Sequence, residues 1–240
     1  MDEGSYGWVA CHPKWRLDEL LADAAAEGLS RKVRACLAAG ADPSWQSWRA
    51  LNKAAMKGSL ECIMELAPVS NIEESGAARA AAGHGREACL AELISRSDRR
   101  RRLDRGLMDA VKGGHVGCVR MLVEAFGGSI GADNALCEAA KGDQAECVRI
   151  LSSVANANHR RHAPLWQAAM AQSWKSLEEL LVLFEEQEEG MTLAHIARLM
   201  HAGGYPGAAM AVEAHVEKRA IAEAAQQAEP RQPTPSLLRL

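Results

Sequence analysis

The residues best suited to chemistry in this chain are its seven cysteines and eight histidines. Four of the cysteines recur at intervals of 27, 29 and 29 residues, at Cys62, Cys89, Cys118 and Cys147. If equivalent helices of successive units carry them, they lie roughly 10 Å apart, as packed helices do. That separation is too large for a disulfide or a shared metal ion. We therefore interpret the four as buried packing residues, because buried cysteine acts as a small hydrophobe.

Two further arrangements point toward catalysis or metal binding, and neither is complete. Cys11 stands beside His12, but adjacent residues rarely face each other, and no third group that would orient the histidine is identifiable. The run from His159 to His162 has the spacing of a metal-binding pair, yet its two central residues are arginines, which repel a cation. The sequence therefore predicts a non-enzymatic protein that uses no metal ion and no cofactor. An enzyme subunit that uses Cys11 or a histidine pair is the alternative.

The densest charge in the sequence is a run of six arginines, at Arg96, Arg99, Arg100, Arg101, Arg102 and Arg105. Such a run is either a solvated loop or a contact for an acidic protein or for phosphate. A formal net charge of −3 and the lack of interleaved aromatic residues disfavour nucleic acid as the ligand. Binding of nucleic acid, phosphate or phosphoinositide through this run is the second functional hypothesis.

The composition indicates that helices position these residues. The chain holds 45 alanines but only two Phe, two Tyr and two Thr, so the residue types that favour strands are scarce. An all-β protein is therefore excluded, and a hydrophobic content of 48% excludes wholesale disorder. No apolar run reaches about 18 residues, and the acidic N-terminus lacks the features of a signal peptide. We expect a cytoplasmic protein whose cysteines are free thiols.

A repeating unit organises most of the chain. Its turn positions are separated by 30, 27, 29, 29 and 29 residues, at Gly28, Gly58, Gly85, Gly114, Asp143 and Gln172. A Leu or Ala lies seven residues before each turn position, and a Cys or Leu lies eight residues after it. This spacing predicts two short helices per unit, joined at the turn, each with one apolar face. One unit cannot bury that face alone, so stacked neighbours must share a continuous core.

The unit resembles the ankyrin repeat, with the best local matches at residues 40–43 (Gly-Ala-Asp-Pro) and 163–169 (Ala-Pro-Leu-Trp-Gln-Ala-Ala). The resemblance spans Leu20 to Leu181 and continues in degenerate form through residues 192–195. It implies an all-α fold, an α-solenoid of stacked helix-turn-helix repeats, with short fingers because the family period is about 33 residues. No unit carries the full Thr-Pro-Leu-His set, so the hydrogen bonds of that histidine between units are expected to be missing. Another α-solenoid is the structural alternative.

We divide the chain into four segments on this basis. Residues 1–17, which include Trp15, are expected to form an N-terminal cap that packs across the first unit. Residues 18–205 form the repeat domain, with six clear units and one degenerate unit. Residues 206–229 form a C-terminal capping helix, and residues 230–240 form a disordered tail.

The resemblance also implies a binding surface, because in ankyrin-like proteins the two residues before each turn and the fingers line one concave face. The candidate partner-binding residues carried over to this chain are, at the pre-turn positions, Met56, Lys57, His84, Lys112 and Lys141 and, in the expected fingers, Trp45, Trp48, Arg99, Arg100, Arg101, Arg102, His159, Arg160 and Arg161. Aromatic and cationic residues dominate interface energetics, so we predict an effector, inhibitor or adaptor that binds another protein with an acidic surface. The opposite, convex face is predicted to be more acidic, through Glu61, Glu65, Glu87, Glu92, Glu146 and Glu178.

Overall fold

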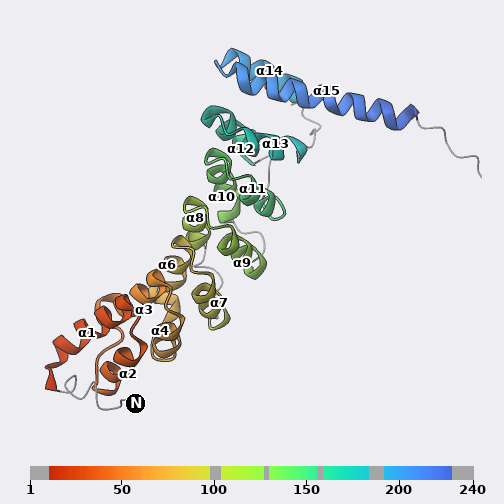
Figure 1. Ribbon diagram of the computed structural model, residues 1–240. Helices are drawn as coiled ribbons and strands as arrows, with labels where there is room; N and C mark the ends of the chain where they lie inside the picture. The colour runs from red at the N-terminus through yellow and green to blue at the C-terminus, as the bar shows by residue number, and fades with distance from the viewer. Residues whose placement is uncertain (1–10, 98–103, 127–129, 156–158, 184–191, 229–240) are drawn as a thin grey trace, which may run out of the picture.

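The computed structural model describes residues 11–97, 104–126, 130–155, 159–183 and 192–228. These residues form α-helices joined by short turns, with no β-strand among them. The all-α prediction is therefore confirmed, and the helices alternate between two layers (Figure 1). We name these the first-helix layer and the second-helix layer, after the order of the two helices within each unit.

Each layer is a row of short helices packed side by side. The first-helix layer consists of α1 (Lys14–Glu27), α3 (Trp45–Lys57), α6 (Ala77–Gly83), α8 (Asp104–Lys112), α10 (Ile130–Lys141) and α12 (His159–Ala171). The second-helix layer consists of α2 (Ser30–Ala38), α4 (Leu60–Leu66), α7 (Glu87–Ser95), α9 (Val116–Phe126), α11 (Ala145–Leu151) and α13 (Trp174–Val182). Two short elements, η2 (Ala67–Val69) and α5 (Ile72–Ser75), lie between α4 and α6. Neighbouring helices contact each other along both rows, so six consecutive units form one stack.

The turn between the two helices of a unit requires a left-handed residue. Gly58 ends α3 with a φ of 87°, and Gly114 follows α8 with a φ of 70°, which confirms these predicted turn positions. Asp143 and Gln172 adopt φ values of 53° and 56°, although left-handed backbone is strained in residues with a side chain. Asp143 offsets part of this cost, because its Oδ1 accepts a hydrogen bond of 3.0 Å from the backbone N–H of Ser176 at the start of α13.

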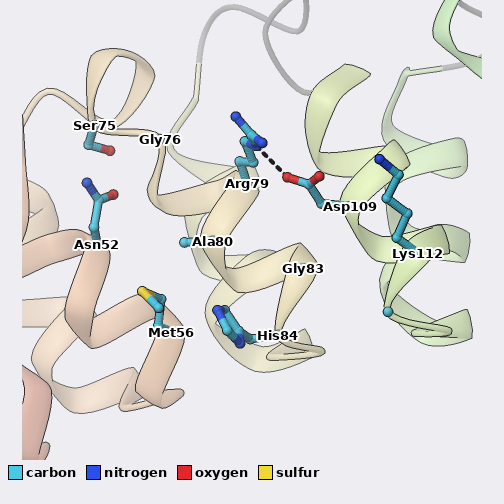
Figure 2. Close-up of a pocket in the computed structure, with 11 residues that line it drawn as sticks. Asn52, Met56, Ser75, Gly76, Arg79, Ala80, Gly83, His84, Asp109 and Lys112 are labelled. Carbon is cyan, nitrogen blue, oxygen red and sulfur yellow. Dashed lines mark hydrogen bonds and ion pairs between the residues drawn. The ribbon is translucent and has the colours of Figure 1, made fainter.

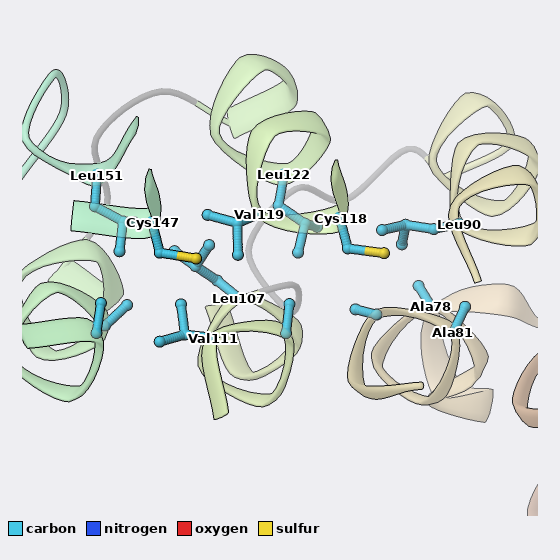
Figure 3. Packing of buried hydrophobic residues seen from close by; sticks show 14 of the residues in the cluster. Ala78, Ala81, Leu90, Leu107, Val111, Cys118, Val119, Leu122, Cys147 and Leu151 are labelled. Carbon is cyan, nitrogen blue, oxygen red and sulfur yellow. The ribbon is translucent and has the colours of Figure 1, made fainter. Parts of the chain in front are cut away.

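The core lies between the two layers, where small residues allow close approach. The cysteine column predicted from the repeat is buried, with at most 1% of each side chain exposed at Cys62, Cys89, Cys118 and Cys147. Figure 3 shows the thiols of Cys118 and Cys147 among Leu90, Val119 and Leu151. Opposite Cys118 and Leu90, α6 presents alanines, of which Ala78 and Ala81 are buried. The interpretation of these cysteines as packing residues is therefore confirmed.

A column of hydrogen bonds connects the units to each other. In each bond, the side chain of the residue that follows a unit's turn contacts a backbone carbonyl oxygen of the preceding unit. That carbonyl group belongs to the residue two positions before the turn of the preceding unit. The bonds run from Arg86 Nε to Met56 at 3.0 Å, from His115 Nε2 to Gly83 at 3.1 Å, and from Ser173 Oγ to Lys141 at 2.9 Å. We expected hydrogen bonds between units to be missing, because no unit carries the full Thr-Pro-Leu-His set. The side chains that follow the turns form hydrogen bonds between units instead.

The two ends of the stack depart from the expected segments. Helix α1 begins at Lys14, so residues 14–17 belong to the first unit, and Trp15 is 65% exposed rather than packed across it. At the other end, α14 (Leu193–Ala202) and α15 (Pro206–Ala228) form a hairpin; α15 contacts α13, whereas α14 makes almost no contact with α12. The predicted tail, residues 230–240, lies outside the described residues. None of the described helices is both long and apolar enough to cross a membrane.

Candidate functional site

The predicted pre-turn residues form an exposed row at the ends of the first helices. Met56 and Lys57 end α3, Lys112 ends α8 and Lys141 ends α10, and His84 directly follows α6. Because neighbouring first helices pack side by side, these five residues follow one another along the surface at the ends of those helices. We name this surface the first-helix face.

The lysines of the first-helix face differ from the neighbouring Lys53 in having no ion-pair partner in the described part of the chain. Within the described residues, the ammonium groups of Lys57, Lys112 and Lys141 form neither an ion pair nor a hydrogen bond. Lys53, one turn earlier on α3, does have a partner, because its Nζ lies 3.3 Å from the Asp23 carboxylate of the preceding unit. The predicted positions are thus the unpaired ones, and their charge is available to an incoming molecule.

Several glutamates of the second-helix layer pair with arginines of neighbouring units. Arg120 of α9 lies 3.4 Å from Glu146 of α11, and two further pairs join Arg34 to Glu65 and Arg149 to Glu179. The hydrogen bond from Arg34 is the main cause that lowers the pKa of the Glu65 carboxyl below its usual value. Glu65, Glu146 and Glu179 are thus neutralised locally by arginines, whereas Lys57, Lys112 and Lys141 have no such partner in the described part of the chain.

A groove of about 640 Å³ opens in the first-helix face between α3, α6 and α8 (Figure 2). Its floor consists of small residues of α6, among them Ala80 and Gly83. Met56 of α3 stands on one side, and Lys112 of α8 on the other. The groove therefore brings together Met56, His84 and Lys112, three of the residues predicted from the sequence.

Two residues of the groove were missed by the sequence analysis. The guanidinium of Arg79 on α6 forms an ion pair with the carboxylate of Asp109 on α8, as Figure 2 shows. This hydrogen bond and the negative charge of Asp109 raise the pKa of Arg79 above its usual value. The two residues are 30 positions apart, the same separation as Asp23 and Lys53. Opposite charges one repeat period apart were therefore the signal that could have identified the pair.

The predicted tryptophan finger is packed rather than free. Trp45 and Trp48 lie within the bounds of α3, where Gln46, Ser47 and Trp48 form a left-handed turn with φ values of 48°, 56° and 63°. Both indole rings are half-buried against the core. The guanidinium of Arg49 lies 5.8 Å from the centre of the Trp45 ring, within range of a cation–π contact. Each indole therefore has only part of its surface to offer a partner.

The remaining predicted contact residues lie mostly beyond what the structure describes. His159, Arg160 and Arg161 begin α12 and are not in a finger, so that placement was wrong; their side chains are outside the described part. Arg99, Arg100, Arg101 and Arg102 fall in the gap between residues 97 and 104. At the edges of this gap, Arg96 pairs with Glu92 at 2.6 Å and Arg105 is exposed.

The residues considered for catalysis, Cys11 and the histidine pairs, do not line the groove. Cys11 is exposed, and all seven cysteines are free thiols. In the described ranges, no cluster of three or more His, Cys, Asp or Glu side chains is arranged to hold a metal ion. The imidazole of His201 lies 3.3 Å from the Glu213 carboxylate of α15, on the surface of the terminal hairpin.

No protein-family model and no curated protein sequence matches this chain at a significant level. Among solved structures, the crystal structure of the human ASB11 ankyrin repeat domain is similar, with a TM-score of 0.64. The match covers 81% of this chain and 96% of that domain, at 18% sequence identity, so the likeness concerns the fold. Stacked repeats of this kind present an extended surface shared by successive units. The two helix layers, the left-handed turns and this structural match together show that the chain has the ankyrin-repeat fold.

Proposed function

We propose that this chain is a non-enzymatic protein–protein interaction module that binds an acidic surface of another protein through its first-helix face. The observation that carries the proposal is the contrast in pairing between the two faces. Within the described residues, Lys112 and Lys141 stand unpaired two residues before their turns, and Lys57 stands unpaired one residue before its turn, whereas arginines of the second-helix layer such as Arg149 are held by glutamates. A row of unpaired cations attracts carboxylates of a partner and speeds its encounter.

Apolar side chains between the lysines support a protein partner rather than a small anion. Met56 is 44% exposed and Met170, at the equivalent position of the sixth unit, is 55% exposed. Flexible thioethers adapt to irregular apolar surfaces and are enriched at interfaces. The first-helix face thus combines charge that orients a partner with apolar area that a partner can bury.

The proposal includes an adaptor, effector or inhibitor role in the cytoplasm. Free thiols at all seven cysteines suit a reducing compartment. Phosphate or nucleic-acid binding by the arginine run stays a prediction without added support, since Arg96 is engaged by Glu92 and the central four arginines lie outside the described residues.

Partner capture followed by mass spectrometry tests the proposal, with charge reversal on each face. The test variant combines Lys57→Glu, Lys112→Glu and Lys141→Glu. The matched control makes the same charge change at exposed cations elsewhere, with Arg31→Glu on α2, Lys175→Glu on α13 and Lys218→Glu on α15. We expect the test variant to lose an acidic partner that the control retains, and the partner's association rate to fall with rising salt.

Two results would contradict the proposal. Equal retention of the partner by both triple variants would remove the first-helix face from the interaction. Loss of binding only when Arg99, Arg100, Arg101 and Arg102 are reversed to Glu would assign the contact to the arginine run instead.

A further inference from the structure

The groove in the first-helix face exists because α6 is made of very small residues. Its sequence is Ala-Ala-Arg-Ala-Ala-Ala-Gly, so Arg79 is its only side chain longer than a methyl group. The neighbouring helices carry longer side chains at the groove walls, such as Met56 on α3 and Lys112 on α8. The surface is therefore hollowed at α6, and the longer side chains of α3 and α8 border the hollow.

Two backbone carbonyl groups that line this groove are already hydrogen-bonded. The Met56 carbonyl oxygen accepts a hydrogen bond from Arg86 at 3.0 Å, and the Gly83 carbonyl oxygen is 3.1 Å from His115 Nε2. Burying an unpaired carbonyl costs free energy, but here both groups are already paired. An apolar side chain can therefore lie on Ala80 and Gly83 beside the half-exposed Met56 thioether.

The charge of the groove favours a carboxylate. Its ionisable lining residues are Arg79, His84, Lys112 and a single carboxylate, Asp109. Arg79 bonds Asp109 through Nε alone, so within the described residues its two Nη groups make no hydrogen bond. The Arg79 side chain is 51% exposed. A guanidinium can bind carboxylates along more than one edge, so a second carboxylate can reach the Nη edge from solvent.

We infer that this groove is an anchor site for an extended segment of a partner protein, one that places an Asp or Glu next to a large apolar residue. The carboxylate binds the Nη edge of Arg79 and the ammonium of Lys112, while the apolar side chain lies on Ala80 and Gly83 against Met56. The inference rests on the proposed function and names the chemistry that one part of the face recognises. Asp109 competes with the partner for Arg79, so it lowers affinity for an acidic segment.

Random peptides displayed on phage and selected against the full-length protein provide the probe. We expect selected peptides to share Asp or Glu adjacent to Leu, Phe or Trp. A fluorescein-labelled copy of the best peptide is then titrated with each variant, and affinity is measured by fluorescence anisotropy.

Three variants and two matched controls locate the site. Ala80→Leu fills the floor, and Lys112→Glu reverses the charge; each is expected to weaken binding about tenfold or more, as loss of an anchor contact does. Asp109→Asn releases Arg79 and is expected to tighten binding several-fold. Ala88→Leu and Lys175→Glu make the same changes at exposed positions of the second-helix layer and are expected to leave affinity within about twofold. Circular dichroism of every variant confirms folding.

The outcomes separate this inference from the proposed function. Failure to enrich any acidic-apolar peptide, or full binding by Ala80→Leu together with unchanged affinity in Asp109→Asn, would overturn the groove as the anchor. If the triple lysine variant still loses its captured partner in that case, the proposed function stands and only the anchor site is wrong. If neither the groove variants nor the triple variant changes binding, both proposals fail.

Discussion

Lys112 and Arg149 show how the same charge acquires different roles in one stack. Arg149 lies within 2.9 Å of Glu146 and also pairs with Glu179 of the next unit, whereas Lys112 has no carboxylate partner in the described part of the chain. Exposed ion pairs add little to stability, so the pairing matters chiefly because it neutralises these charges locally. The unpaired lysines leave the other face able to attract acidic groups.

The buried thiols make a residue-scale prediction. Burial and, to a smaller extent, the charge of Glu87 raise the pKa of the Cys118 thiol to about 11. At about pH 8 the reactive thiolate is therefore rare, and solvent does not reach the sulfur. We expect a thiol reagent to modify exposed Cys11 quickly in the native protein, and Cys118 only after unfolding, as measured by mass spectrometry of timed samples. Rapid native labelling of Cys118 would contradict the repeat register.

The same shift makes stability depend on pH in the alkaline range. The folded pKa of Cys118 is raised, so the folded state holds its proton more tightly than the unfolded state. Its contribution is complete below the unfolded pKa near 9 and is lost as pH rises toward about 11. Cys118→Ala should therefore reduce the decline in the free energy of unfolding across that window, as measured by urea unfolding at several pH values.

At the scale of elements, the bonds between units keep the binding residues in register. The carbonyl groups that accept these bonds belong to Met56, Gly83 and Lys141, which are themselves pre-turn positions of the first-helix face. The ladder therefore sets the spacing of successive first helices at the point where a partner would bind. Core packing alone leaves this outer edge less constrained.

His115 provides the test of the ladder. His115→Ala removes the bond to the Gly83 carbonyl and should lower the free energy of unfolding by roughly 1–2 kcal/mol, because the half-buried acceptor loses its partner. His84→Ala is the matched control, since His84 is exposed at the end of α6 and should change stability by less than about 0.5 kcal/mol. Urea unfolding measures both. Equal effects of the two substitutions would show that the ladder contributes nothing.

On the scale of the whole molecule, the stack is uneven along its length. Units one to six contact their neighbours through both layers, but the α14–α15 hairpin joins the stack mainly through α13 and α15. The side chains of residues 217–225 of α15 are all exposed, and this end of the helix projects beyond the stack in Figure 1. Repeat proteins derive stability from neighbour interfaces, so the hairpin should open more readily than the centre.

Hydrogen exchange of the native full-length chain tests this gradient. We expect amides of residues 217–228 to exchange first, those of α14 next, and those of α8 and α10 last, because local opening follows the density of buried contacts. Peptide-resolved mass spectrometry gives the order. Uniform protection from α8 to α15 would indicate that the hairpin is as firmly attached as the central units.

Much of the fold was predictable because a repeat presents the same local evidence several times. The six turn positions, the buried cysteine column and the two-helix unit all depend on short-range spacing, which apolar periodicity and left-handed glycines such as Gly58 record directly. The same repeat register also predicted that the lysines before the turns are exposed. The length of α12 was misjudged, because His159, Arg160 and Arg161 look like a polar finger although they begin a helix.

The sequence by itself determined the helical unit, its period and which residues face the core, because these depend on contacts within one unit and with its similar neighbours. Only the tertiary structure decided which charges are neutralised and where the first-helix face is hollowed. Arg79 meets Asp109, and Arg34 meets Glu65, across units about one period apart, and the groove appears where the alanines of α6 lie between longer side chains of two other helices. Such features depend on how side chains from separate units come together in space, which local spacing does not specify.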